Sequence, residues 1–281
     1  TAWPRRCAAS PADETVTTNL EGDLAFALEL ADLADRMTFP HFRSSDLRVD
    51  HKADASEVTI ADRGAEAAMR ERLAAVRPED AVLGEEEGLV GSPDATSRWI
   101  IDPVDGTSNF VRGVPIWATL VALEHAGELV IGVASAPALG RRWWAAKGLG
   151  AFADGRPIHV SGIADVADAH LAYTDIAEFY DFGVGDAVMG LAQRSWRARG
   201  LGDFWMHVLV AEGAFDIAVE PVVNLWDLAA IKVIVEQAGG RFTDLLGEPR
   251  ADGGDACSTN GLLHDEVIAA FTALRGGTTR S

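Results

Sequence analysis

One segment, residues 99–109, constrains the fold of this chain more than any other and reads WIIDPVDGTSN. Three apolar residues typical of a buried strand run directly into Asp102, and a Pro-Val turn then leads to Asp105. Both carboxylates can therefore point from the carboxyl end of one strand into the same crevice. Gly106 allows close approach of the backbone, and the N–H groups from Gly106 to Ser108 can face an anion.

This strand end offers the oxygen atoms that a hard cation needs. Mg²⁺ prefers carboxylates and carbonyl groups, so Asp102, Asp105 and the carbonyl of Val104 are candidate ligands. A cation beside backbone N–H groups would form a site for a metal-bound phosphate. The alternative is a tight turn in which Asp and Thr side chains only cap the backbone, because Asx turns use the same residue types. The segment alone does not decide between the two.

Three further acidic segments stand at predicted strand ends or helix starts. Glu85 follows a short apolar run, Asp62 opens a helix predicted over 60–76, and Asp227 opens a helix predicted over 225–238. Each has an ordinary structural explanation, as a solvated loop or as a favourable charge at a helix N-terminus. The occurrence of all of them in one chain favours a shared cation site.

Hydrophobic spacing divides the chain into two halves of different character. The first half reads as helices over 20–37 and 60–76 on an antiparallel sheet that contains hairpins over 116–135 and 141–160. The second half alternates helices and strands, with helices over 186–194, 203–212, 225–238 and 264–274 and strands over 170–175, 195–200, 214–220 and 240–244. We predict a flexible extension over 1–19, an α+β half over 20–160 and an α/β half over 161–281, with the halves packed tightly enough to count as one domain.

The charge and cysteine content narrow the possible partners. Lys and Arg total 24 against 43 Asp and Glu, a formal net charge of −19. Nucleic acids and anionic membranes need a basic face, so this balance argues against both. Cys7 and Cys257 lack metal-ligand spacing, which argues against a zinc or disulfide framework and fits a reducing cytoplasm. No stretch approaches the roughly 18 apolar residues of a membrane span.

The acidic segments together form the pattern of a known family. The order V-T-x-x-D ending at Asp62, G-E-E beginning at Gly84, W-I-I-D-P-x-D-G-T-x-N-F at 99–110 and W-D-x-A-A around Asp227 resembles the inositol-monophosphatase family of metal-dependent phosphatases. The resemblance extends over roughly residues 20–272. It implies an α/β fold built as a five-layered αβαβα sandwich, a homodimer, and two or three Mg²⁺ ions per site.

The resemblance also implies roles for the matching residues. The implied metal ligands are Glu85, Asp102, Asp105, Asp227, the carbonyl of Val104 and, for a weaker third ion, Asp62. The residues matching those that position the attacking water are Glu85, Asp62 and Thr107, and those matching the phosphate cradle are Gly106, Thr107 and Ser108. One metal would lower the pKa of a bound water, and a second about 4 Å away would stabilise the leaving alkoxide.

We therefore expect direct hydrolysis of a phosphate monoester without a covalent phosphoenzyme. A rival class of phosphatases uses an aspartyl nucleophile in a D-x-D motif. Asp102 and Asp105 are separated by Pro-Val rather than by a single residue, so they match that motif poorly.

The resemblance implies that the pocket for the leaving group lies around Glu220 and the segment 199–204. Inositol-specific members of the family tend to carry small residues where this chain has Gly202-Asp203. A carboxylate there suits a substrate with an ammonium or imidazolium group. Asp203 could instead be a helix N-cap, or do both. Arg199 could line the pocket mouth, although exposed strand arginines are common.

Four other segments carry a more specific resemblance. Residues 109–118, 135–146, 202–204 and 258–267 closely resemble the histidinol-phosphatase branch of the family found in actinobacteria. This implies hydrolysis of L-histidinol phosphate in histidine biosynthesis. The alternatives are an inositol monophosphatase or another small phosphomonoesterase of the same family, and a non-catalytic metal- or phosphate-binding protein. Substrates with a second phosphate would need extra basic residues, whereas the segments around Asp203 and Glu220 are acidic.

Overall fold

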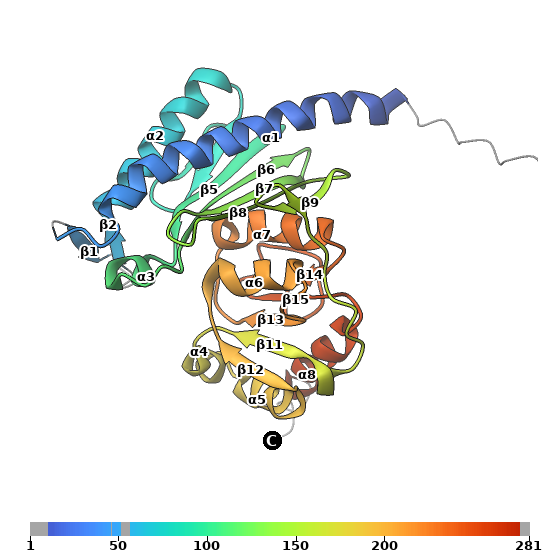
Figure 1. Ribbon diagram of the computed structural model, residues 1–281. Helices are drawn as coiled ribbons and strands as arrows, with labels where there is room; N and C mark the ends of the chain where they lie inside the picture. The colour runs from blue at the N-terminus through green and yellow to red at the C-terminus, as the bar shows by residue number, and fades with distance from the viewer. Residues whose placement is uncertain (1–10, 46, 52–56, 276–281) are drawn as a thin grey trace, which may run out of the picture.

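The structure is a computed structural model that describes residues 11–45, 47–51 and 57–275. Figure 1 shows its elements stacked in five layers, in which helices alternate with two large β-sheets. This arrangement confirms the predicted αβαβα sandwich. None of the helices within these ranges combines the length and the apolar character needed to span a lipid bilayer.

The first large sheet contains eight strands, which are β3 (Ala81–Gly84), β4 (Gly88–Val90), β5 (Ser97–Asp105), β6 (Ala118–His125), β7 (Glu128–Ala136), β8 (Arg141–Ala146), β9 (Gly150–Ala153) and β10 (Arg156–Pro157). Their order is β10-β9-β8-β7-β6-β5-β3-β4, and only β3 and β5 run parallel. The two predicted hairpins are present and turn at Ala126-Gly127 and Asp154-Gly155, and all four residues have positive φ angles.

The second large sheet has the strand order β12-β11-β13-β15-β14. Its strands are β11 (His170–Tyr173), β12 (Arg197–Gly200), β13 (Ile217–Glu220), β14 (Arg241–Thr243) and β15 (Ala256–Thr259). The strand β11 runs parallel to β12 and β13, while β15 pairs antiparallel with β13 and β14. A separate two-stranded sheet joins β1 (Val49–His51) to β2 (Glu57–Thr59).

Helices form the other three layers (Figure 1). The first layer contains α1 (Pro11–Thr38) and α2 (Ile60–Val76), the central layer α6 (Asp203–Ala211) and α7 (Leu225–Gln237), and the last layer α4 (Ile176–Asp181), α5 (Gly185–Arg194) and α8 (His264–Arg275). The short helix α3 (Thr107–Arg112) follows β5, and 3₁₀ turns span Phe39–His41 and Val166–Asp168.

The core follows from the alternation of side chains along the strands. On β5, Trp99 and Ile101 pack with α1 and α2, whereas Ile100 packs with α6 and α7 on the other face. The central layer lies very close to the first sheet. A Cβ on Gly132 of β7 would stand 2.1 Å from the carbonyl oxygen of Ala230 in α7, so only glycine fits there. This packing holds α7 directly against the first sheet.

Several elements differ from the prediction. The helix α1 begins at Pro11, so residues 11–19 of the expected flexible extension are helical, while residues 1–10 lie outside the described residues. Six short elements have no predicted counterpart, because each is too short to show a periodic hydrophobic pattern: β1, β2, β4, α3, α4 and β15. The helix α7 contacts strands of both large sheets, so the two predicted halves share the central layer. The division of the chain near residue 160 stays a prediction.

Candidate active site

Three carboxylates from two distant parts of the chain meet where β5 ends and α7 begins. They are Asp102, Asp105 and Asp227, hereafter the carboxylate trio, and one oxygen atom of each lies within 4.8 Å of the others. The predicted turn between Asp102 and Asp105 is a β-bulge, where the register of β5 against β6 shifts. The bulge lets two acids of one strand face the first turn of α7 together.

Backbone N–H groups hold each member of the trio. The donors are Val104 to Asp102 Oδ1 (2.9 Å), Phe204 to Asp105 Oδ2 (2.8 Å) and Asn224 to Asp227 Oδ2 (2.8 Å). The last bond belongs to a capping box that starts α7. The carboxylates are therefore oriented by the fold before any ligand binds.

The negative charges of the trio are unfavourable in the fold unless a cation balances them. Burial raises the pKa of Asp102 and Asp105 well above the ordinary range, and repulsion from neighbouring carboxylates raises both further. Burial also raises the pKa of Asp227, to about 7. Three closely spaced, oxygen-only ligands of this kind match the preference of Mg²⁺, so the residues fit the metal that the resemblance implies.

Glu85 lies in the turn after β3 and lines the same cavity as the trio. Its charge contributes to the raised pKa of both Asp102 and Asp227, although its oxygens do not fall within the close spacing of the trio. Val104 also lines the cavity, and its carbonyl accepts a 2.9 Å hydrogen bond from the Thr107 hydroxyl. The structure thus brings both predicted ligands to the trio's cavity.

Asp62 and Thr107 form a pair beside the trio. Asp62 is completely buried at the start of α2, where it accepts hydrogen bonds from the backbone and the side chain of Thr59. The Thr107 hydroxyl lies 3.1 Å from Asp62 Oδ1, within hydrogen-bond distance. Thr107 lines the cavity but Asp62 does not. This geometry suits Asp62 as the partner of the Thr107 hydroxyl and does not bring it forward as a direct metal ligand.

The predicted phosphate cradle opens α3. Gly106 is the N-cap of this helix with a φ of 82°, and Gly106, Thr107 and Ser108 all line the cavity. A Cβ at Gly106 would lie 3.0 Å from the carbonyl oxygen of Ile116 and 3.3 Å from Asp203 Oδ2. Both the backbone angle and the tight space therefore require glycine.

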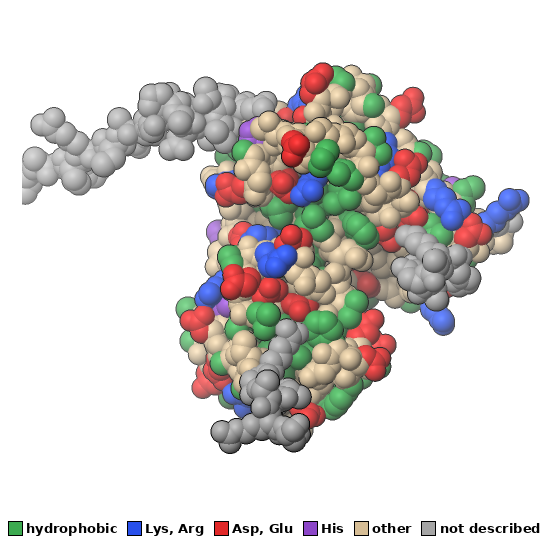
Figure 2. Space-filling model, turned by 180° about the vertical axis from the view of Figure 1, so that it is seen from behind, with side chains coloured by type: hydrophobic (Ala, Val, Ile, Leu, Met, Phe, Trp, Pro, Cys, Tyr) green, Lys and Arg blue, Asp and Glu red, His purple; other side chains and the backbone are tan. Residues whose placement is uncertain are grey.

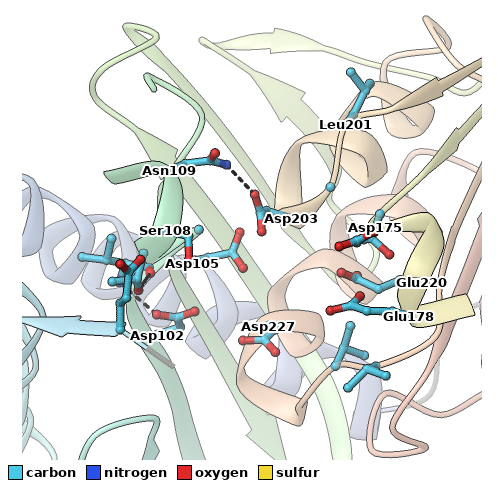
Figure 3. A pocket seen from close by; sticks show the side chains of 18 of the residues that line it. Asp102, Asp105, Ser108, Asn109, Asp175, Glu178, Leu201, Asp203, Glu220 and Asp227 are labelled. Atoms are coloured by element: carbon cyan, nitrogen blue, oxygen red, sulfur yellow. Dashed lines mark hydrogen bonds between the residues drawn. The ribbon is translucent and has the colours of Figure 1, made fainter. Parts of the chain in front are cut away.

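The trio lies in a cavity of about 770 Å³, which is large enough for a small phosphate ester. Nine of the residues that line it are acidic: Glu57, Glu85, Asp102, Asp105, Asp175, Glu178, Asp203, Glu220 and Asp227. Arg112 is the one cationic side chain among its described lining residues. Figure 3 shows Asp175, Glu178 and Glu220 grouped across the cavity from Asp102 and Asp105, with Asp203 above. Asp175, Glu178, Asp203 and Glu220 are hereafter the acidic wall.

Asp203 is the first residue of α6 rather than its N-cap, a position that Gly202 occupies. Its φ of 52° is unusual for a residue other than glycine. The side-chain amide of Asn109 donates a 2.7 Å hydrogen bond to Asp203 Oδ2 (Figure 3). Burial raises the pKa of Asp203 to about 6, and the charge of Glu178 contributes. The predicted alternative of an N-cap is wrong, and the side chain lines the cavity.

Glu220 ends β13 and is buried against a histidine of α6. His207 Nε2 lies 3.3 Å from Glu220 Oε2, and His207 Nδ1 lies 2.8 Å from the Ser258 hydroxyl. Burial lowers the pKa of His207 to about 3, so the ring is neutral and the contact is a hydrogen bond rather than an ion pair. Burial raises the pKa of Glu220 well above its ordinary value.

Arg199 is not among the residues that line the cavity. It is exposed on the edge strand β12, and its guanidinium donates to the carbonyl of Ala198 at 2.9 Å. The structure therefore brings Gly202, Asp203 and Glu220 together in one pocket but leaves Arg199 outside it.

Comparison with known proteins shows the family to which a chain with this site belongs. A profile of the inositol monophosphatase family matches residues 19–275. The chain belongs to this family. Membership accounts for the acidic motifs and for the five-layered fold, and it confirms the resemblance drawn from the sequence.

Individual family members match over nearly their whole length. The histidinol-phosphatase of Mycobacterium tuberculosis is 51% identical, over 89% of this chain and 98% of its own. The histidinol-phosphatase of Streptomyces coelicolor is 46% identical, over 88% and 95%. Among solved structures, the IMPase of Thermotoga maritima superposes with a TM-score of 0.82 at 31% identity, covering 91% of this chain and 98% of its own.

The site contains residues for which the sequence predicted no role. Asp175 and Glu178 lie at the N-cap and in the first turn of α4, outside the family motifs, and Asn109 stands in the D-G-T-x-N-F motif and orients Asp203. One signal in the sequence could have found α4: Asp175 and Glu178 have the spacing of a capping box, and Asp175 does accept the N–H of Ala177 at 2.9 Å.

Proposed function

We propose that this protein hydrolyses L-histidinol phosphate to L-histidinol and phosphate in a Mg²⁺-dependent reaction. The observation that carries the proposal is the acidic wall, which faces the carboxylate trio across a single cavity. Histidinol phosphate has an amine and an imidazole on the side of the molecule away from its phosphate. A wall of carboxylates suits such a leaving group, and it suits neutral polyols or second phosphates much less.

The trio, Glu85 and the carbonyl of Val104 would hold the metal ions, and the expected number stays two or three per site. Bound Mg²⁺ supplies a water of lowered pKa as nucleophile and stabilises negative charge on the leaving oxygen. The cluster needs such a charge, since burial and mutual repulsion disfavour its ionised form. The neighbouring N–H groups of Gly106, Thr107 and Ser108 would bind the phosphate oxygens and orient the phosphorus.

The protein's own proton acceptor is the pair of Thr107 and Asp62. The single hydrogen of Thr107 Oγ1 has two acceptors within reach, the carbonyl of Val104 and Asp62 Oδ1. With the carbonyl of Val104 bound to a metal ion, that hydrogen would point to Asp62 Oδ1, and the hydroxyl oxygen could accept a hydrogen bond from a water in the cavity. Asp62 is held in turn by Thr59. The pair thus fixes the direction from which a water approaches the phosphate. In-line attack requires such a fixed direction.

The acidic wall would bind the amino alcohol. Asp203 is oriented by Asn109, and Glu220 by the neutral His207. These contacts hold the carboxylates in place while they accept hydrogen bonds from the ammonium and the ring nitrogens of the substrate. Asp175 and Glu178 are the exposed members of the wall and add negative charge at its solvent side. A homodimer and a cytoplasmic location stay predictions that rest on the family resemblance and the cysteine content.

The proposal is tested by measuring phosphate release with Mg²⁺ and with a chelator from histidinol phosphate, inositol 1-phosphate and fructose 1,6-bisphosphate. We expect metal-dependent release with histidinol phosphate as the preferred ester. Preference for the bisphosphate or for inositol 1-phosphate would refute the substrate assignment and leave the metal site intact. Release that persists in the chelator would refute the metal chemistry.

A further inference from the structure

One face of α2 carries three charged residues, Asp62, Glu66 and Arg70, at successive helical turns. Asp62 is the partner of Thr107 described above. Glu66 is almost completely buried, at 1% exposure, and lies outside the cavity. Arg70 forms a close ion pair with it, with 2.8 Å between Nη2 and Glu66 Oε1. Taking two charges out of water costs free energy. A buried ion pair outside the cavity therefore raises the question of what it does for the site.

The pair holds the turn that carries Glu85. Glu66 Oε2 accepts the backbone N–H of Glu86 at 2.8 Å, and Oε1 accepts that of Glu87 at 3.0 Å. Arg70 donates to the carbonyl of Gly88 at 2.7 Å, on the far side of the same turn. These hydrogen bonds hold the backbone of the turn between β3 and β4 against α2.

Gly84 shows how closely the pair approaches the turn. A Cβ at this position would lie 2.5 Å from Glu66 Oε1 and 2.7 Å from Arg70 Nη2. The glycine before Glu85 thus makes room for the ion pair. A side chain there would push the pair away from the turn or the turn away from the trio.

We propose that Glu66 and Arg70 are positioning residues that hold Glu85 at the metal site. The same helix face then sets the distance between the Asp62–Thr107 pair and Glu85, so that water and metal are aligned by one rigid element. Neither residue touches substrate. The inference rests on a metal-binding role of the trio and Glu85, and it does not depend on which ester is hydrolysed.

The test is a Mn²⁺ titration by calorimetry of the wild type, Glu66→Gln and Arg72→Met, without substrate. Arg72 is a matched control on α2, since it forms an exposed ion pair with Glu29. Loss of a residue that orients a metal ligand typically costs about 10–100-fold in affinity. We expect the Mn²⁺ dissociation constant of Glu66→Gln to rise at least about 10-fold, and that of the control to stay within about twofold.

A second readout separates positioning from loss of fold. The half-saturating Mg²⁺ concentration for hydrolysis should rise in Glu66→Gln, while KM for the ester at saturating Mg²⁺ stays close to wild type. Amide hydrogen exchange at Glu86 and Glu87 should become faster. If Glu66→Gln does not fold, the double variant Glu66→Gln/Arg70→Met removes both charges and leaves none unpaired in the interior.

A folded single or double variant that binds Mn²⁺ as tightly as the wild type would overturn the proposal. An equal loss of affinity in Arg72→Met would overturn it as well. If the wild type prefers an ester other than histidinol phosphate, the proposed substrate is wrong, but the Mn²⁺ titration still decides the role of Glu66 and Arg70.

Discussion

The backbone N–H of Phe204 donates a 2.8 Å hydrogen bond to Oδ2 of Asp105. The bond joins the last residue of β5 to the first turn of α6, and Phe204 directly follows Asp203. The candidate metal site and the acidic wall are thereby fixed relative to each other through one residue pair. The distance between the phosphate and the cationic group of a substrate is then set by the fold.

Asp105→Asn should abolish most of the turnover with little loss of fold. The amide oxygen of asparagine can still accept the Phe204 N–H, so the packing of α6 on β5 is preserved. The negative charge that a metal ion needs is gone, and we expect turnover to fall by several orders of magnitude. Steady-state phosphate release and thermal unfolding measure the two effects. The exposed Asp94→Asn is the matched control, and substantial turnover in Asp105→Asn would contradict the ligand role.

Thr107→Val should lower kcat and leave KM nearly unchanged. The substitution keeps the shape of the side chain but removes the hydroxyl that faces Asp62 Oδ1. A positioned proton acceptor contributes typically about 10²–10⁴-fold to a rate. Thr107→Ser keeps the hydroxyl and should recover most of that loss. Equal rates for the valine and serine variants would show that the hydroxyl has no part in the reaction.

Glu178→Gln should weaken binding of histidinol phosphate selectively. Glu178 is exposed at the cavity rim, so its contribution is screened by solvent, and we expect KM to rise only a few-fold. KM for inositol 1-phosphate should not change, because that leaving group is neutral. Asp181→Asn, on the same helix but outside the cavity lining, is the control. A matching rise for both esters would argue against charge recognition by α4.

Mg²⁺ should stabilise the protein more at high pH than at low pH. The pKa of Asp227 is raised in the fold from its ordinary 3.8 to about 7, and those of Asp102 and Asp105 are raised too. Without metal, these carboxyl groups favour the folded state fully below pH 3.8, where they are protonated. Their contribution to the free energy of unfolding is lost as the pH rises through about 7. Bound Mg²⁺ offsets that loss, and at low pH protons compete with it.

Thermal unfolding with Mg²⁺ and with chelator, at about pH 8 and about pH 5, measures this difference. A Mg²⁺ concentration about 100 times Kd gives about 2.7 kcal/mol of stabilisation. His207, whose pKa is lowered, changes stability in the opposite sense but equally with and without metal. A Mg²⁺ effect of the same size at both pH values would contradict the account.

The parts of the site that sequence reasoning could predict are those encoded locally. Asp102, Asp105 and Asp227 stand at the ends of elements with clear hydrophobic patterns, and β5 and α7 form where predicted. Their meeting point follows because strand ends and helix starts gather at one edge of a layered fold. The excess of acidic residues in the sequence is visible on the surface, where Figure 2 shows carboxylates spread over one face of the molecule and Lys and Arg in small groups.

The parts that were missed depend on contacts between distant residues or on very short elements. Asn109 and Asp203 are 94 positions apart in the sequence, and no local pattern at either residue predicts the hydrogen bond between them. The helix α4 is too short for a periodic pattern, and the capping-box spacing of Asp175 and Glu178 indicates a helix start without marking Glu178 as a pocket residue. The sequence left both the pocket mouth and an exposed strand position open for Arg199, because alternation along an edge strand does not say which face borders a pocket.

The most direct test of the account is the ratio of kcat/KM for histidinol phosphate to that for inositol 1-phosphate, in the wild type and in Asp203→Asn. Asparagine tolerates the positive φ of this position and can still accept the Asn109 amide, so only the charge changes. We predict a ratio well above one in the wild type that falls at least about 10-fold in the variant, the equivalent of one lost charge-assisted hydrogen bond. An unchanged ratio, with both esters affected equally, would contradict recognition of the substrate by the acidic wall.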